Sequence, residues 1–230
     1  MQRITYERRP QGDRTLFVVR TDDQMLLPGL AAGGFAHEGD AWTKSFPSDA
    51  PHLDRAWLNI QELLVPWLRQ TVGLDPVPWA GTLASVIDRL GRDGIDWWLT
   101  GSAALAVQGV KVSPADLDLV VAGDDARAVG DLLVDGLVEP VARVDWFCDW
   151  WGRAFLGCRV EWVGGIGPRA DEPEVTDFGP TAAAALRTVT WHGRPVRVPP
   201  IELQRAVSVR RGLSDRVAAI DRYRLRTALR

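Results

Sequence analysis

The stretch WWLTGSAALAVQGVKVSPADLDLVV, residues Trp97–Val121, carries the clearest indication of fold in this chain. It contains two apolar runs, each typical of a buried strand, and an alanine-rich segment between them that is typical of a short helix. The first run ends in Gly101-Ser102, and the second carries two aspartates one residue apart, Asp116 and Asp118. Because carboxylates are seldom found in buried strands, this pair needs a chemical explanation.

Asp116 and Asp118 are predicted to share one face of their strand, since side chains two residues apart in a strand point to the same side. Leu117, Leu119 and Val121 then point to the opposite side, into the core. Two carboxylates about 7 Å apart along a strand repel each other and raise each other's pKa. A divalent cation removes this repulsion, and Mg²⁺ prefers such oxygen ligands. The alternative is an edge strand whose acids face water.

Gly101 and Ser102 lie where the first strand passes into the alanine-rich helix. Glycine allows the backbone to approach a ligand closely, and the free N–H groups at a helix start attract anions. The strand-helix-strand order can bring this helix start and the two aspartates to the same end of adjacent strands. We therefore predict that Gly101 and Ser102 bind the phosphates of a nucleoside triphosphate (NTP), while Asp116 and Asp118 hold the metal. The alternative is an ordinary serine N-cap.

The Gly101-Ser102 and Asp116-Leu117-Asp118 motifs resemble those of the nucleotidyltransferase superfamily, which has a DNA polymerase β-type fold. The resemblance covers residues 78–198 and extends to the minimal, antibiotic-modifying and abortive-infection toxin-type members from bacteria. It implies an enzyme that transfers a nucleoside monophosphate from an NTP such as ATP to an acceptor hydroxyl and releases pyrophosphate. It also implies Mg²⁺ or Mn²⁺ as cofactor. The comparison with toxin–antitoxin systems rests partly on fold and says little about the acceptor.

The resemblance further implies a third acid on a later strand of the same sheet. Glu161 is the predicted residue, because it lies in an apolar strand context and shares a face with Arg159 and Val163. Its role would be metal ligation or general-base catalysis toward the acceptor hydroxyl. The family more often has aspartate at this place, and Asp145 and Asp149 are weaker alternatives.

Basic residues near the motifs are candidate contacts for phosphate. Lys111 precedes the aspartate pair, and Arg153 is predicted at the tip of a hairpin. Both are assigned to nucleotide binding. The alternative for Lys111 is a solvated loop position, and the alternative for Arg153 is contact with the acceptor. Four arginines of the predicted C-terminal helices are divided between the cleft (Arg205, Arg216) and solvent (Arg210, Arg211).

The order of predicted elements indicates the α+β class, with a nucleotidyltransferase-type mixed sheet flanked by helices. Residues 1–74 form a small N-terminal α+β unit of unknown role, and residues 75–230 form the nucleotidyltransferase-like domain with its C-terminal helices. The N-terminal unit is predicted to hold two hairpins and a helix over 54–70, which Pro66 kinks or ends early. Residues 29–34 are predicted to form a loop.

Two later strands, 141–145 and 154–163, are predicted on either side of a turn at residues 151–153. A hairpin and two helices are then expected to complete the chain.

Composition and charge exclude several classes of protein. The chain has 230 residues, 46% hydrophobic, with a formal net charge of −3, which argues against non-specific binding of nucleic acid. No uncharged run approaches the roughly 20 residues of a membrane span, so we expect a soluble cytoplasmic protein without a membrane partner. Two cysteines and three scattered histidines predict neither a disulfide framework nor a zinc site.

The acceptor is left open between a small molecule, a protein hydroxyl and the end of an RNA. The N-terminal unit offers a surface for a protein partner. An alternative function is a non-catalytic nucleotide-binding or regulatory protein that keeps the fold, and a third is a structural domain whose acids face water.

Overall fold

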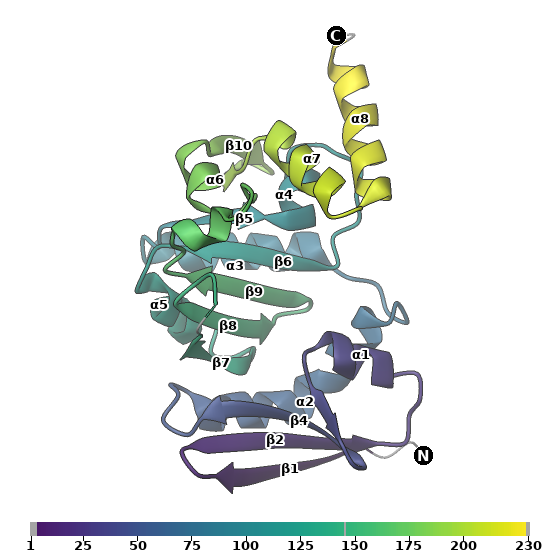
Figure 1. Ribbon diagram of the computed structural model, residues 1–230, viewed down its shortest axis with the longest axis vertical. Helices are drawn as coiled ribbons and strands as arrows, with labels where there is room; N and C mark the ends of the chain where they lie inside the picture. Colours follow the sequence, from purple (N-terminus) through teal and green to yellow (C-terminus); the bar gives the residue numbers. More distant parts are fainter. Residues whose placement is uncertain (1–3, 145, 229–230) are drawn as a thin grey trace.

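The N-terminal unit is an antiparallel sheet of four strands in the order β1-β2-β4-β3 (Figure 1). The computed structural model describes residues 4–144 and 146–228. The predicted hairpins and helix of this unit are confirmed. Its elements are β1 (Ile4–Gln11), β2 (Arg14–Thr21), α1 (Leu27–Ala32), β3 (Ala36–Glu38), β4 (Ala41–Pro47) and α2 (Leu53–Thr71).

Helix α1 occupies most of the segment 29–34, so the predicted loop is wrong. The reason is tertiary packing, because α1 lies directly on α2. A Cβ added at Gly29 would lie 3.1 Å from Cδ2 of Leu68, so glycine permits this close approach. Pro66 does not end α2, which continues to Thr71.

The second unit contains a five-stranded mixed sheet in the order β5-β6-β9-β8-β7, in which only the β6–β9 pair is parallel. Helices α3 and α5 cover one face, and α4 connects β5 to β6 (Figure 1). The predicted α+β class, with a mixed sheet flanked by helices, is therefore confirmed. The elements are α3 (Trp79–Arg92), β5 (Trp97–Thr100), α4 (Gly101–Val107), β6 (Asp116–Val121), α5 (Asp125–Leu132), β7 (Leu137–Arg143), β8 (Trp150–Phe155) and β9 (Arg159–Gly164).

The predicted turn at residues 151–153 is wrong, since these residues lie inside strand β8. This strand pairs with β7 on one side and with β9 on the other. Trp151 packs on one face of the sheet, and Ala154 is buried in the core on the opposite face. A segment covered on both faces and paired along both edges is stable as a central strand rather than as an exposed turn.

The remaining elements lie at the end of the molecule farthest from the N-terminal unit (Figure 1). The predicted hairpin and C-terminal helices are confirmed. Within the described residues no helix is both long and apolar enough to cross a membrane. The elements are a 3₁₀ turn η1 (Pro168–Asp171), α6 (Pro180–Ala184), β10 (Arg187–Trp191), β11 (Arg194–Val198), α7 (Ile201–Arg210) and α8 (Ser214–Ala228).

One apolar core runs through both units. It joins Phe17 and Trp67 of the N-terminal unit to Leu117 and Trp162 of the five-stranded sheet. Asn59 of α2 adds polar contacts, since its side-chain amide donates to two backbone carbonyls near the start of β7 at 2.9 Å each. The division at residues 74 and 75 stays a prediction, and the shared core ties the N-terminal unit closely to the sheet.

The alternation predicted along β6 is confirmed. Leu117, Leu119 and Val121 point into the core beneath the helices. Asp116 and Asp118 therefore lie on the other face of the sheet. This face is where the candidate site is built.

Candidate active site

A row of polar side chains crosses the open face of the five-stranded sheet, one from each strand. The strand register pairs Thr100 with Asp118, Asp118 with Glu161, Glu161 with Arg153, and Arg153 with Glu139. Neighbouring strands lie about 4.8 Å apart, so each side chain is next to the following one. The parallel pairing of β6 with β9 thus brings Glu161 beside Asp118.

Asp118 lies among acidic neighbours. Desolvation of its carboxyl group raises its pKa well above the ordinary value of 3.8, and the charges of Asp116 and Glu161 raise it further. Arg159 offsets only part of this effect. The site therefore favours an added positive charge at Asp118.

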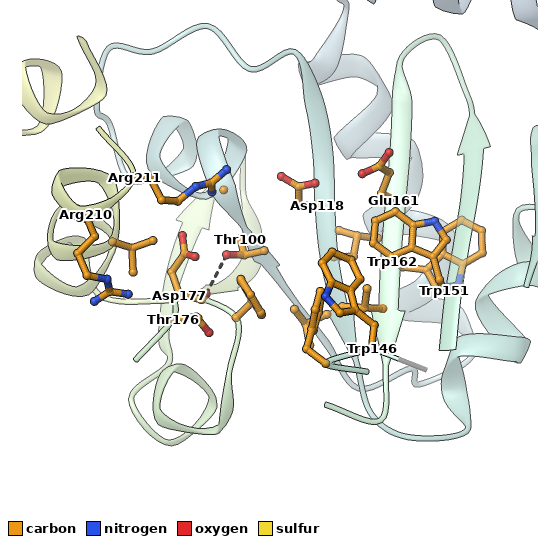
Figure 2. A pocket seen from close by; sticks show the side chains of 17 residues that line it. Thr100, Asp118, Trp146, Trp151, Glu161, Trp162, Thr176, Asp177, Arg210 and Arg211 are labelled. Carbon is orange, nitrogen blue, oxygen red and sulfur yellow. Dashed lines mark hydrogen bonds between the residues drawn. The ribbon is translucent and has the colours of Figure 1, made fainter. Parts of the chain in front are cut away.

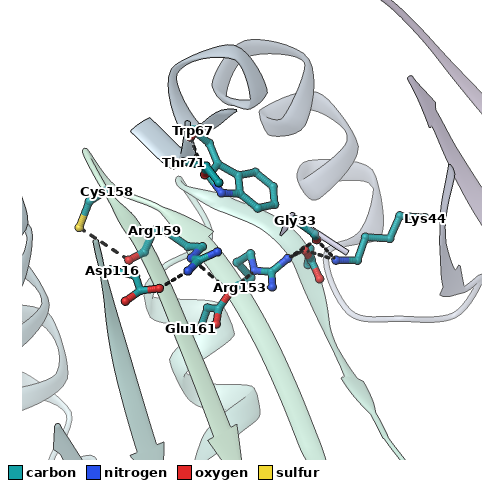
Figure 3. Close-up of polar contacts among 10 residues, drawn as sticks. Gly33, Lys44, Trp67, Thr71, Asp116, Arg153, Cys158, Arg159 and Glu161 are labelled. Carbon is teal, nitrogen blue, oxygen red and sulfur yellow. Dashed lines mark hydrogen bonds and ion pairs between the residues drawn. The ribbon is translucent and has the colours of Figure 1, made fainter. Parts of the chain in front are cut away.

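The Asp116–Asp118 pair fits a divalent cation, because it offers hard oxygen donors from one strand face in a negatively charged surrounding. Glu161 fits less directly. Arg159 donates to Asp116 and lies 3.4 Å from Glu161, so its guanidinium bridges these two carboxylates (Figure 3). Among residues 4–144 and 146–228, no three Asp, Glu, His or Cys side chains are grouped so that they could hold a metal ion. Ligation by Glu161 would require Arg159 to move.

Gly101 places the start of α4 against Asp118. Its φ of +67° lies in the left-handed region that favours glycine. A Cβ at this position would overlap Oδ2 of Asp118, so another residue would displace the carboxylate. The side-chain amide of Gln204, from α7, donates to the Gly101 carbonyl at 3.0 Å. Ser102 follows in the first turn of α4 and is half-buried.

A pocket of about 520 Å³, here called the main pocket, opens beside these residues (Figure 2). Gly101, Asp118 and Glu161 line it, whereas Ser102, which follows Gly101, and Asp116, two residues before Asp118, are not among its lining residues. One side is formed by Asp177 and the end of α7, and the other side is aromatic (Figure 2). Further charged and aromatic residues that were not predicted as site residues also line the main pocket. They are Asp177, Arg210, Arg211, Trp146, Phe147, Trp151, Trp162 and Phe178.

Asp177 and the arginines at the end of α7 were not assigned to the site by sequence reasoning. Thr100 Oγ1 donates to the backbone carbonyl of Asp177 at 2.8 Å and holds this loop residue at the pocket. Burial raises the pKa of Asp177, and the charges of Arg211 and Arg216 partly offset the rise. Arg210 and Arg211 are exposed, as predicted, and they also line the pocket. Only the tertiary position of α7 distinguishes them from surface arginines.

Other predicted contacts lie elsewhere. Lys111 is exposed on the loop before β6 and is not part of the main-pocket lining. Arg205 pairs with Asp221 at 2.6 Å and does not reach the lining either. Asp145 lies outside the described residues, and Asp149 is not among the residues that line the main pocket.

Arg153 is buried inside β8, so its predicted place at a hairpin tip is wrong. Its guanidinium donates to Glu161 at 2.6 Å and also to Glu139 (Figure 3). Lys44 of β4 reaches the same Glu139 at 2.6 Å, and the Gly33 carbonyl accepts from both Arg153 and Lys44. With its donors used in this way, Arg153 is not placed to contact a triphosphate.

The charges of Lys44, Glu139 and Arg153 compensate one another. Burial opposes ionisation of Glu139, but Arg153 and Lys44 more than offset that effect and hold its pKa below the ordinary value. Burial lowers the pKa of Lys44, and Glu139 counteracts the change. The N-terminal unit thereby contacts Arg153 through the Gly33 carbonyl, and Arg153 in turn bonds to Glu161, the predicted third acid.

Residues 82–148 match the family model of the aminoglycoside-2''-adenylyltransferases. This part of the chain is similar to that nucleotidyltransferase family. The matched segment includes both the Gly101-Ser102 turn and the Asp116–Asp118 pair. A search of curated proteins gives no significant match.

Several solved nucleotidyltransferase structures are distantly similar. One, from Thermotoga maritima, is 21% identical and aligns over 63% of this chain and 91% of its own, with a TM-score of 0.47. The lincosamide antibiotic adenylyltransferase LnuA, solved with lincomycin, is 12% identical over 60% and 94%, with a TM-score of 0.45. ANT(2'')-Ia, solved with adenylyl-2''-tobramycin, is 15% identical over 64% and 97%, with a TM-score of 0.38.

Proposed function

We propose that this protein is a metal-dependent nucleotidyltransferase that moves a nucleoside monophosphate from an NTP to a hydroxyl group of a small molecule and releases pyrophosphate. The observation that carries the proposal is the meeting of Asp118, Glu161 and Gly101 in one pocket, with Asp116 beside them. The match to an adenylyltransferase family supports ATP as the donor. A cytoplasmic location belongs to the same proposal.

Each group has a role in this reaction. Asp116 and Asp118 would hold Mg²⁺ or Mn²⁺, which when bound neutralises charge that develops on the phosphates. The N–H groups at Gly101 and Ser102 would bind the β- and γ-phosphates. Arg211 supplies a cation at the same side of the pocket, and Lys111 remains a proposed second one if its loop closes over the phosphates.

Glu161 is proposed to take the proton of the acceptor hydroxyl. The hydroxyl oxygen attacks the α-phosphorus, and the bond from that phosphorus to the bridging oxygen of pyrophosphate breaks. Arg153 and Arg159 flank the Glu161 carboxylate and orient it. Metal ligation by Glu161 is a second proposed role, which would follow a movement of Arg159.

The test is incubation of the purified protein with each α-labelled NTP, Mg²⁺ or Mn²⁺, and a library of hydroxyl compounds. Labelled product and equimolar pyrophosphate are the expected result, with ATP as the preferred donor. Stabilisation by NTP and metal in a thermal melt without transfer to any acceptor would instead favour the non-catalytic nucleotide-binding alternative. The absence of both stabilisation and transfer would exclude the proposed function.

A further inference from the structure

The two sides of the main pocket differ in chemistry (Figure 2). Gly101 and Arg211 line the side that would hold the phosphates in the proposed function. The opposite side carries four aromatic rings, and no step of the proposed reaction uses them. These rings, here called the aromatic wall, belong to Trp146, Phe147, Trp151 and Phe178.

The rings of the aromatic wall contact one another and leave one ring open to a ligand. The centroid of the Trp146 ring lies 4.1 Å from that of Phe147 and 6.2 Å from that of Trp151. Phe147 in turn lies 4.9 Å from Phe178. Trp146 is nevertheless 61% exposed, and exposure of so large an apolar group to water is unfavourable. An open indole beside packed rings, at the edge of a pocket, offers a stacking surface for a planar ligand.

The floor of the pocket next to the aromatic wall is apolar as well. Val120 and Val163 lie two residues after Asp118 and Glu161 on their strands, and therefore on the same face of the sheet. Both valines pack with Trp151 in one apolar cluster. A ligand body that extends from the acids in this direction therefore lies over apolar side chains.

Trp151 lies close to Glu161. In the antiparallel pair of β8 and β9, Glu161 is opposite Arg153, and Val163 is opposite Trp151. Trp151 is thus a diagonal neighbour of Glu161, at about 7–8 Å. The Arg153 guanidinium donates to Glu161 at 2.6 Å and lies 5.8 Å from the centroid of the Trp151 ring. A hydroxyl group carried on a small ring system can span the separation between this indole and the carboxylate.

A further pocket of about 430 Å³ adjoins the aromatic wall. It shares Trp146, Phe147 and Phe178 with the main pocket, so the two hollows meet at these rings. A ligand on the aromatic wall can therefore be larger than one ring without entering the side of the main pocket that would hold the phosphates.

The geometry of the transfer assigns the aromatic wall to the acceptor. In phosphoryl-type transfer the attacking and leaving oxygens lie roughly in line with the phosphorus. With pyrophosphate leaving toward Gly101 and Arg211, the acceptor enters from the opposite side, where Glu161 and the aromatic wall lie (Figure 2). The nucleoside is attached to the phosphorus at neither of these two positions.

We propose that the aromatic wall binds the acceptor, and that the acceptor is a small molecule whose hydroxyl group is carried on, or one carbon away from, a planar aromatic ring. The ring stacks on Trp146 and Trp151, and the hydroxyl lies at Glu161. This inference rests on the proposed function. In the transfer step the acceptor oxygen bonds to the α-phosphorus, pyrophosphate leaves with the electron pair of the broken bond, and the hydroxyl proton passes to Glu161.

The first test measures binding of three uncharged alcohols to the full chain by calorimetry. 2-Naphthalenemethanol is the aromatic probe, its decahydro derivative is the saturated probe, and methyl β-D-glucopyranoside is the polar one. The aromatic probe should bind about 2- to 12-fold more tightly than the saturated probe, the range expected for one aromatic pair. The glucoside should not bind at concentrations at which the aromatic probe saturates the protein.

Variants of Trp146 test the stacking itself, and this exposed side chain can be replaced without opening the core. W146A should remove most of the preference for the aromatic probe, and W146F should keep it. L58A is the matched control, because Leu58 of α2 is a 54% exposed apolar side chain that lines neither pocket, and it should change no affinity. Equal affinity for the aromatic and saturated probes, or a W146A variant that binds the aromatic probe as the parent does, would overturn the inference.

The second test separates the acceptor from the base of the nucleotide, which is also a planar ring. Binding of 2-naphthalenemethanol is measured again in the presence of saturating α,β-methylene-ATP and Mn²⁺. The aromatic probe should bind at least as tightly as without nucleotide, and W146A should leave the affinity for the nucleotide analogue unchanged. Displacement of the probe by the analogue would assign the aromatic wall to the nucleobase and overturn the inference.

The third test uses the same alcohols as acceptors with α-labelled ATP. 2-Naphthalenemethanol should have the highest kcat/KM, and W146A should raise its KM with little change in kcat. Transfer to the saturated alcohol or the glucoside but not to the aromatic one would overturn the inference while the proposed function stands. Stacking of the aromatic probe beside the nucleotide, with no transfer to any acceptor, would overturn both the acceptor assignment and the proposed function.

Discussion

Glu139 and Asp118 lie on the same face of the same sheet, in the same row of side chains, yet their surroundings are opposite. Glu139 is bonded to Lys44 and Arg153, and its pKa is lowered in spite of its burial. Asp118 is surrounded mainly by acids, and its pKa is raised. Glu139 is therefore satisfied within the protein, whereas Asp118 gains most from a cationic ligand.

The difference arises from the strands that flank each residue. β8 and the neighbouring N-terminal unit supply cations to Glu139, while β6 and β9 supply further carboxylates to Asp118. The end of the row at Glu139 holds the two units together, and the end at Asp118 opens into the main pocket, which is the proposed active site.

The largest expected effect is that of D118N on turnover. Losing a metal ligand removes several kcal/mol of transition-state stabilisation, so kcat should fall by about a thousandfold or more. The melting temperature should stay unchanged or rise, because the variant removes a poorly compensated carboxylate. Pyrophosphate release and thermal denaturation measure the two effects. Turnover within tenfold of the parent would contradict the assignment of Asp118.

E139Q should have the opposite effect on stability. It leaves Arg153 and Lys44 buried without their shared anion, which costs about 3–5 kcal/mol in the free energy of unfolding. The double variant K44M/E139Q should be less destabilised than E139Q, since it also removes Lys44, which loses its anionic partner in E139Q, whereas Arg153 keeps its ion pair with Glu161. Urea denaturation measures the change, and E62Q, at an exposed glutamate of α2, is the control with an expected change below about 0.5 kcal/mol. If E139Q lowered the free energy of unfolding as little as E62Q does, the buried ion pairs of Glu139 would not stabilise the protein.

G101A tests the contact between α4 and Asp118. Alanine at this φ costs about 1–2 kcal/mol of stability, and its Cβ displaces the carboxylate, so kcat should fall about 10- to 100-fold. G212A is a matched control, because Gly212 has a φ of +66° and no atom within 4 Å of an added Cβ. G212A should lose a similar amount of stability, but its kcat per folded molecule should not change. Equal effects of the two variants on kcat would refute the specific contact with Asp118.

The smallest effect is expected in the pH dependence of stability. The folded-state pKa of Glu139 is lowered, so its ionised form stabilises the protein above its ordinary pKa of 4.5, and this contribution is lost as the pH falls through the lowered value. Stability should therefore decline on the acid side, and E139Q should show a shallower decline. Urea denaturation at a series of pH values below neutrality measures the slopes. Parallel slopes for the two proteins would contradict the assigned ionisation of Glu139.

The strand-helix-strand unit and the arrangement within it can be predicted from the amino-acid sequence alone. Side chains alternate along any strand, so Asp116 and Asp118 had to share a face opposite Leu117 and Leu119. The turn at the glycine before Ser102 and the strands formed by the apolar runs around it are likewise predictable, because they depend only on local geometry and hydrophobic pattern. The α+β class followed from the order of such local elements.

Tertiary structure decided which strands are neighbours, because strand order depends on packing between segments far apart in the chain. The parallel pairing of β6 with β9 placed Glu161 beside Asp118, and the pairing of β8 with β7 and β9 committed Arg153 to Glu139 and Glu161. The packing of α7 then added Arg211 to the main pocket. Local pattern carries no information on these pairings, because the residues next to an arginine in the sequence do not show whether it will lie on an open surface or at a pocket.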